Sequence, residues 1–282
     1  MVAEPNVILR AVPTAERSRR VSITRVEQDR PDQTTDTVAV ERGLEVRVGG
    51  DAFAVIMRTP GSDGDLAAGF LLSEGVIATR DHIVQLVQAA DDDVVEVTLT
   101  AVCTDALAER QARGRQVTMN SSCGLCGRPS LASLQVSAPV VDAALRVPAT
   151  TVSQLPLLLR ASQPTFDTTG GLHAAALVGL DGQLAASAED VGRHNAVDKI
   201  LGRLLMAGRL PLSDLMLVVS GRTSYEILQK AWIAGVPLVA AVSAPSSLAI
   251  ELAEEAGITL IGFSRDGRFN IYAHPGRIAT RP

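Results

Sequence analysis

The sequence predicts an α/β protein with a three-layer C-terminal domain and a smaller α+β domain before it. Short apolar segments alternate with helical patterns from about residue 151 onward, which is typical of strands and helices stacked in layers. Between about residues 40 and 100, polar and apolar residues alternate with the period of half-buried strands. The chain has 282 residues, 46% of them hydrophobic, enough for one large or two modest cores.

The N-terminal part is expected to hold an arm and then the small α+β domain. Residues 1–36 are polar and contain three prolines, so we expect a loose, variable arm that leads into a first strand near Val21. Residues 37–148 are assigned to the small domain. Its elements are a hairpin with a Gly49-Gly50 turn, a helix that Gly75 ends, and an alternating strand, over residues 44–57, 63–72 and 94–100.

Residues 149–282 are assigned to the three-layer domain. Val197, Ile200 and Leu201 begin the most regular helical pattern, which Gly208 ends. The expected helices span 152–161, 197–205, 225–234 and 248–256, and the expected strands span 173–180, 184–188, 215–219, 237–242, 259–263 and 268–272. Ligands bind α/β sheets at the carboxyl ends of the strands, so the loops after these strands are candidate sites.

Composition argues against several classes of protein. The net charge of −5 and the 3% of aromatic residues argue against nucleic-acid binding. No apolar run approaches the roughly 20 residues of a membrane span, and the arginine-rich start lacks the apolar core of a signal peptide. Three cysteines do not make a disulfide framework. We therefore expect a cytoplasmic protein without nucleic-acid or membrane partners.

Two of the three cysteines lie in a Ser- and Gly-rich segment, Ser121-Ser122-Cys123-Gly124-Leu125-Cys126-Gly127, within an expected loop over residues 115–130. The spacing lets one thiol reach the other, and the glycines let the backbone bend. Arg128 follows at once, and a nearby cation favours thiolate over thiol. The segment indicates exposed sulfur chemistry.

Three chemical interpretations of Cys123 and Cys126 compete with a pair of surface cysteines that has no role. A structural zinc needs four ligands, and only Cys103 and four dispersed histidines remain to complete them. A thioredoxin-like dithiol opens a helix after a strand, whereas this pair lies far from the clear strand–helix units. The third interpretation is a persulfide carrier, in which one cysteine accepts a sulfur atom and passes it on.

Polar segments at the expected strand ends could hold an anionic ligand. Asp190 suits the N-cap of the regular helix, with Arg193 and His194 in its first turn. Ser220, Gly221, Arg222 and Thr223 join a buried strand to the next helix, and Ser243–Ser247 does the same one unit later. Residues 166–171 form a further polar segment before a strand. Each segment alone could be an ordinary helix cap or, for His194, a structural histidine, but together they favour a phosphate-bearing ligand.

These motifs resemble those of a known family, the FdhD family of formate dehydrogenase accessory sulfurtransferases. The matching segments run in order from about residue 40 to the end; they are EVRV (45–48), MRTPG (57–61), GFLLSEG (69–75), SCGLCG (122–127), TGGLH (169–173), EDVGRHNAVDK (189–199), SGRTSYE (220–226) and GFSR (262–265). The first ~35 residues match no such segment.

The resemblance implies a function and a set of partners. Family members take persulfide sulfur from a cysteine desulfurase and deliver it to the molybdenum (or tungsten) bis(molybdopterin guanine dinucleotide) cofactor before its insertion into formate dehydrogenase. Cys123 would carry the persulfide and Cys126 would assist. The cofactor would be a bound client, with no permanent cofactor. The resemblance also implies a cytidine-deaminase-like fold and a homodimer.

The same resemblance assigns a cofactor-binding stretch, Phe263, Ser264, Arg265, Asp266, Gly267 and Arg268. A solvent hairpin with ordinary arginines is the alternative, but Phe263 could stack on guanine while the arginines hold phosphate. The chain lacks the ligand motif of zinc deaminases, so no metal site is expected. A cofactor chaperone that does not need Cys123, and a zinc-dependent deaminase or hydrolase, are the rival function classes.

Overall fold

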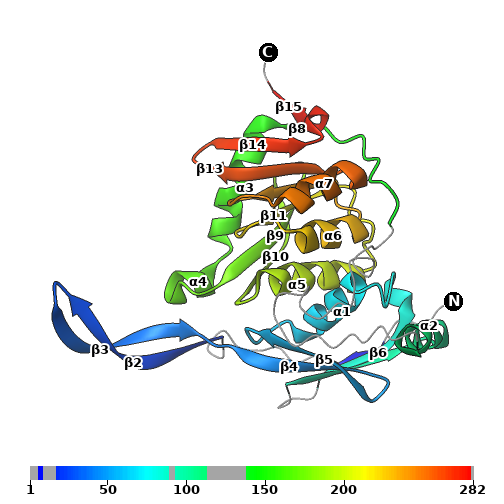
Figure 1. Cartoon of the computed structure of the whole chain (residues 1–282), viewed down its shortest axis with the longest axis horizontal. Helices are drawn as coiled ribbons and strands as arrows, with labels where there is room; N and C mark the ends of the chain where they lie inside the picture. Colours follow the sequence, from blue (N-terminus) through cyan, green and yellow to red (C-terminus); the bar gives the residue numbers. More distant parts are fainter. Residues whose placement is uncertain (1–5, 9–16, 89–92, 113–137, 281–282) are drawn as a thin grey trace.

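The computed structural model describes residues 6–8, 17–88, 93–112 and 138–280, and its larger part is built on a six-stranded mixed sheet (Figure 1). The strand order is β10-β9-β11-β12-β13-β14. The strands are β9 (His173–Gly179), β10 (Leu184–Asp190), β11 (Leu215–Val219), β12 (Leu238–Ala241), β13 (Thr259–Arg265) and β14 (Arg268–Ala273). β11, β12 and β13 are parallel, whereas β9 and β14 run against them and β10 runs against β9.

Helices cover both faces of this sheet, which confirms the predicted three-layer α/β class. α5 (Arg193–Met206), α6 (Tyr225–Ile233) and α7 (Ser247–Ala256) lie on one face, and α3 (Ala149–Ala161) lies on the other (Figure 1). Successive residues of a strand point to opposite faces. Leu217 and Val219 accordingly join the core under α5 and α6, and Met216 and Val218 join the core under α3. The finer likeness to cytidine deaminases stays a prediction.

The N-terminal part holds a second, five-stranded sheet of order β1-β6-β7-β4-β5. Its strands are β1 (Asn6–Ile8), β4 (Arg42–Val48), β5 (Asp51–Arg58), β6 (Ile83–Gln88) and β7 (Val94–Leu99), and its helices are α1 (Asp63–Ser73), the short η2 (Arg80–His82) and α2 (Ala101–Ala112). The expected hairpin, helix and strand are confirmed. β6 and α2 were not expected; for β6 the reason is that a short apolar run does not distinguish strand from helix by period alone.

Helices α1 and α5 meet at two glycines, and this contact joins the two sheets. A Cβ on Gly69 would lie 1.9 Å from the carbonyl oxygen of Asp198, and a Cβ on Gly202 would lie 1.9 Å from that of Asp65. The absence of both Cβ atoms lets the helix backbones touch. One continuous cluster of core residues runs from the N-terminal sheet through α1 and α5 to one face of the large sheet.

Both lysines of the chain are buried beside this contact. Lys199 pairs with Asp190 at 2.6 Å and donates to the carbonyl of Thr59, and Lys230 pairs with Asp198 at 2.7 Å. The Ser73 hydroxyl also donates to Asp198 at 2.7 Å. Buried charges need such partners, so these pairs fix how α1 and α5 lie against each other.

Residues 18–39 form a two-stranded antiparallel ribbon that extends away from the body, where a loose arm was expected (Figure 1). Its strands are β2 (Ser18–Glu27) and β3 (Arg30–Ala39). Gln28 and Asp29 join them with φ of 48° and 64°, and positive φ at both central residues is what a type I′ hairpin turn requires. The expected first strand near Val21 is confirmed as β2. The return strand β3 was not expected, because this turn lacks the Asn-Gly or Asp-Gly pair that marks such hairpins.

Four smaller elements complete the fold. α4 (Pro164–Thr169) occupies most of the segment that was expected to be a loop, and Gly170 ends it at φ 64°. β8 (Val147–Pro148) pairs in parallel with β15 (Ile278–Ala279), and the 3₁₀ turn η4 (Pro275–Arg277) precedes β15. None of the helices in the described ranges is long and apolar enough to cross a membrane.

Candidate functional site

The predicted loops meet at one edge of the six-stranded sheet. The carboxyl ends of the parallel strands β11 and β12 lead into Ser220 and the Ser243–Ser247 segment at this edge. Because β9 and β10 are antiparallel, His173 at the start of β9 pairs with Asp190 at the end of β10, also at this edge. The β13–β14 turn lies there as well. The expectation that these segments share an edge is confirmed.

Two helix N-termini reach this edge without side-chain caps. The N-cap of α5 is Gly192, which has no side chain to accept a helix N–H. The N-cap of α6 is Ser224, whose hydroxyl accepts none. Arg193 is half-buried in the first turn of α5, and its Nε has no hydrogen-bond partner among the described residues. Arg222 is exposed just before α6. Helix N-termini with adjacent guanidinium groups attract anions.

Two buried hydroxyls lie at the same edge. Thr223 is fully buried and Ser264 is 1% exposed, and within the described ranges neither hydroxyl oxygen has a hydrogen-bond partner. Thr223 is tied to the next loop, since its N–H donates to Ala244 and its carbonyl accepts from Ser246. We call Arg193, Gly221, Arg222 and Thr223, with the N-termini of α5 and α6, the anion cradle.

Asp190 supports the anion cradle from inside. Its carboxylate is fully buried, pairs with Lys199, and accepts the N–H groups of Thr59 at 3.2 Å and Gly192 at 2.8 Å. The expected N-cap role of Asp190 is therefore wrong, because Gly192 occupies that position. Its side chain holds the loop rather than reaching a ligand. Burial lowers the pKa of Lys199, and the Asp190 carboxylate opposes that shift.

His194 is held inside the edge rather than free. Its Nε2 lies 2.8 Å from Glu226 and 3.3 Å from the Ser224 hydroxyl. His173 is more accessible and borders the anion cradle, because a Cβ on Gly221 would lie 3.4 Å from both His173 and Arg193. Burial, the positive charge of Arg193 and the electrostatic effect of His194 all lower the pKa of His173. The neutral form of its ring is therefore favoured.

The β13–β14 hairpin presents Phe263 at the same edge. Phe263 is 38% exposed, has φ of 52° in a bulge of β13, and lies 6.0 Å from the Arg265 guanidinium. A left-handed aromatic residue is strained and marks a candidate functional position. Asp266 and Gly267, both with positive φ, form the expected turn, and Arg268 pairs with Arg265 across it.

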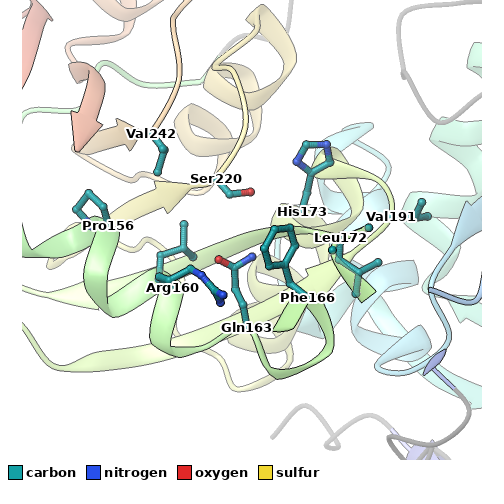
Figure 2. Close-up of a pocket in the computed structure, with 12 residues that line it drawn as sticks. Pro156, Arg160, Gln163, Phe166, Leu172, His173, Val191, Ser220 and Val242 are labelled. Atoms are coloured by element: carbon teal, nitrogen blue, oxygen red, sulfur yellow. The ribbon is translucent and has the colours of Figure 1, made fainter. Parts of the chain in front are cut away.

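A pocket of about 650 Å³ lies between α3, α4 and the start of β9 (Figure 2). Its polar lining comprises Arg160, Gln163, His173 and Ser220, and its aromatic lining is Phe166. Phe166 belongs to the polar segment 166–171 that the sequence marks as a candidate ligand-binding loop, and Gly170 and Gly171 of that segment also line the pocket. Arg160 and Gln163 were not expected as site residues, because nothing in their local sequence distinguishes them from surface residues of a helix.

Cys123 and Cys126 lie outside the described residues, so their roles stay predictions. Cys103, in α2, is buried and forms no disulfide. No group of three or more His, Cys, Asp or Glu side chains within the described ranges could hold a metal ion.

Known proteins resemble this chain over most of its length. The sequence model of the FdhD/NarQ family matches residues 39–279. The chain belongs to the FdhD/NarQ family. Among curated members, the sulfur carrier protein FdhD of Streptomyces coelicolor is 46% identical over 273 residues, covering 94% of this chain and 96% of that protein. The one of Mycolicibacterium paratuberculosis is 48% identical over 258 residues, covering 86% and 92%.

The fold is also found in a solved structure. A protein from Desulfotalea psychrophila, described as a formate dehydrogenase accessory protein, superposes with a TM-score of 0.73, over 93% of this chain and 99% of that chain, at 23% identity. At that identity the likeness shows the fold alone. Among the described family segments, some line the sheet edge, and others, such as those of Gly69 and Lys199, form the buried contact of α1 and α5.

Proposed function

We propose that this protein is a sulfur carrier in the maturation of formate dehydrogenase. The observation that carries the proposal is the near-full-length similarity to proteins named sulfur carrier protein FdhD, together with the Cys-x-x-Cys segment in the sequence. In this proposal Cys123 accepts the sulfane sulfur of a cysteine desulfurase persulfide and passes it to the molybdenum (or tungsten) bis(molybdopterin guanine dinucleotide) cofactor.

The sulfur transfer is a thiol–disulfide-type exchange. The Cys123 thiolate attacks the terminal sulfur of the desulfurase persulfide, a new S–S bond forms on Cys123, and the desulfurase cysteine leaves as a thiolate. No net oxidation occurs in this step. Cys123 returns to the thiolate when it passes the sulfur on as sulfide, with the two electrons supplied by the accepting metal centre. Arg128 favours the thiolate form, and Cys126 assists as a second thiol.

The sheet edge supports binding of the cofactor as substrate. The cofactor carries pyrophosphate groups and guanines, which need N–H groups, guanidinium groups and stacking surfaces. The anion cradle offers the first two, and the buried hydroxyls of Thr223 and Ser264, which have no partner among the described residues, are further donors at this edge. Phe263 and Arg265 offer an exposed ring beside a cation. Ser264, Asp266, Gly267 and Arg268 complete the proposed cofactor stretch. The protein would hold the cofactor as a client, without a permanent cofactor.

The partners follow from this role. We propose a cysteine desulfurase as sulfur donor and formate dehydrogenase as recipient of the loaded cofactor, in the cytoplasm, with the protein acting as a homodimer. A cofactor-binding chaperone that does not need Cys123 is the rival function, and a zinc-dependent deaminase is a weaker one.

Intact-mass spectrometry tests the sulfur-carrier role directly. Purified protein incubated with a cysteine desulfurase and cysteine is expected to gain the mass of one sulfur atom. Cys123→Ala should abolish this gain and formate dehydrogenase maturation in cells, whereas Cys126→Ala should have a milder effect. Full enzyme activity in cells that carry only Cys123→Ala would favour the chaperone. A stoichiometric zinc signal in the same protein would favour the zinc-dependent deaminase as its function.

A further inference from the structure

The pocket between α3, α4 and β9 is separate from the cofactor stretch that the sequence singles out. At about 650 Å³ it lies within the range of roughly 300–1,000 Å³ that is usual for small-molecule sites. Besides Phe166, five apolar side chains line it, and they are Pro156, Leu159, Leu172, Val191 and Val242; all but Leu159 are labelled in Figure 2. Neither Phe263 nor Arg265 lines it. The ligand of this pocket therefore has to be inferred from the residues that line it.

The pocket offers a surface for a flat heterocycle. The Phe166 ring lies inside it, and the Arg160 guanidinium carbon lies 5.1 Å from the centre of that ring, over its face. Arg160 also forms an ion pair with Asp167 on the solvent side. Aromatic and guanidinium planes are the groups on which nucleobases stack in proteins.

Gln163 adds a group that can recognise the edge of such a ring. The residue is 5% exposed, and Figure 2 shows its amide pointing into the pocket beside Phe166. The carboxamide can both donate and accept hydrogen bonds. A base edge with adjacent donors and acceptors would satisfy it.

The wall that carries Phe166 is fixed by a buried carboxylate. The two oxygens of Glu189 accept the N–H groups of Thr165 at 3.0 Å and Phe166 at 2.7 Å, at the start of α4. Glu189 is buried at the end of β10, next to Asp190. The ring is therefore positioned by the sheet before any ligand arrives, which lowers the cost of binding.

The pocket borders the anion cradle. His173 and Ser220 line the pocket, and His173 and Arg193 both lie 3.4 Å from the position of a Cβ on Gly221. Burial and the positive charge of Arg193 lower the pKa of His173, which favours the neutral form of its ring. A ligand with a base in the pocket would direct phosphate groups onto the cradle.

We infer that the α3–α4 pocket binds the purine base of a nucleotide whose phosphates lie on the anion cradle. The inference rests on the proposed function only in that the cofactor would be the nucleotide's natural source. It assigns one of the two guanines to Phe166, Gln163 and Arg160, leaving Phe263 as a separate stacking surface for the other.

Calorimetric titration of the full chain with GDP and with inorganic pyrophosphate tests the inference. Phe166→Ala should weaken GDP binding about 5- to 100-fold, since base stacking on an aromatic ring contributes this much, while pyrophosphate binding should stay unchanged. Where the titration resolves two GDP sites, Phe166→Ala should lower the affinity of only one of them. Phe166→Tyr keeps the ring and should bind GDP as the wild type does. Leu157→Ala, on an exposed part of α3, is the matched control and should have no effect.

The outcomes that overturn the inference are distinct. Equal GDP affinity of Phe166→Ala and wild type would place the base elsewhere, as would a loss caused by Phe263→Ala alone. Equal binding of GDP and pyrophosphate by the wild type would mean that no base is recognised. If Phe166→Ala does not fold, Gln163→Leu replaces it, with weaker GDP binding expected. If the wild-type protein gains sulfur on Cys123 but binds no GDP, the inference about the pocket is wrong and the proposed sulfur-carrier function is unaffected.

Discussion

The contact between α1 and α5 gives a sharp test of the packing. Replacing Gly69 with alanine would place a methyl group 1.9 Å from the Asp198 carbonyl oxygen. A carbon and an oxygen need about 3.3 Å, so the two helices would have to separate by more than about 1 Å. The opposing atoms are backbone atoms, so no side-chain rotation relieves the clash. The separation would also weaken the hydrogen bond from Ser73 to Asp198.

Two effects of opposite sign set the magnitude. Alanine gains about 1 kcal/mol over glycine within a helix. Overpacking costs about 1–3 kcal/mol and sometimes more, and the rigid partner places Gly69→Ala at the upper end. We expect a net loss of about 2 kcal/mol or more in the free energy of unfolding. A Cβ on Gly202 would also lie 2.6 Å from the Gly69 nitrogen, so the double alanine variant should lose less than the sum.

Urea unfolding measures these losses. Far-UV circular dichroism reports the whole chain, and the fluorescence of the single tryptophan, Trp232 in α6, reports the large sheet. Gly276→Ala is the matched control, because a Cβ there meets nothing within 4 Å and φ is not positive; it should stay within about 0.5 kcal/mol. An unchanged midpoint for Gly69→Ala would show that the helix backbones do not touch.

Three further predictions concern charged groups. Lys199→Met should cost about 3–5 kcal/mol in urea unfolding, since Asp190 would be left buried without its cation; a matching loss in Lys199→Met combined with Asp190→Asn would contradict this. The pKa of His173 is lowered from its ordinary 6.5, so the unfolded chain takes up this proton first as pH falls and stability drops below about pH 6.5. His173→Gln should show a smaller drop than the wild type between about pH 8 and pH 5.5, and an equal drop would refute the assignment. Arg265→Ala should weaken GDP binding at the hairpin by about 1.5–3 kcal/mol if it makes a charge-assisted bond; equal affinities in titration would mean that Arg265 does not hold the nucleotide.

Most elements of the fold were predictable because their signals are local. Alternation over residues 44–57 gave the β4–β5 hairpin, and the 3.6-residue spacing of Val197, Ile200 and Leu201 gave α5. The shared sheet edge was also predictable, since parallel strands with helical crossovers bring their carboxyl ends together. Strand β2 was expected near Val21, but its hairpin with β3 was missed because Gln28 and Asp29 adopt positive φ without the usual turn residues.

The residues themselves determined the family, the class of fold and the sulfur chemistry to be tested, because motifs, periodicity and the spacing of Cys123 and Cys126 are properties of the linear chain. The tertiary structure alone decided which polar groups are accessible. Asp190 looked like a helix cap and is a buried partner of Lys199, whereas Phe166 looked like part of a loop and lines a pocket. The pocket brings α3, α4, β9 and the ends of β11 and β12 together. Local patterns cannot show this, because burial and contact depend on segments far apart in the sequence.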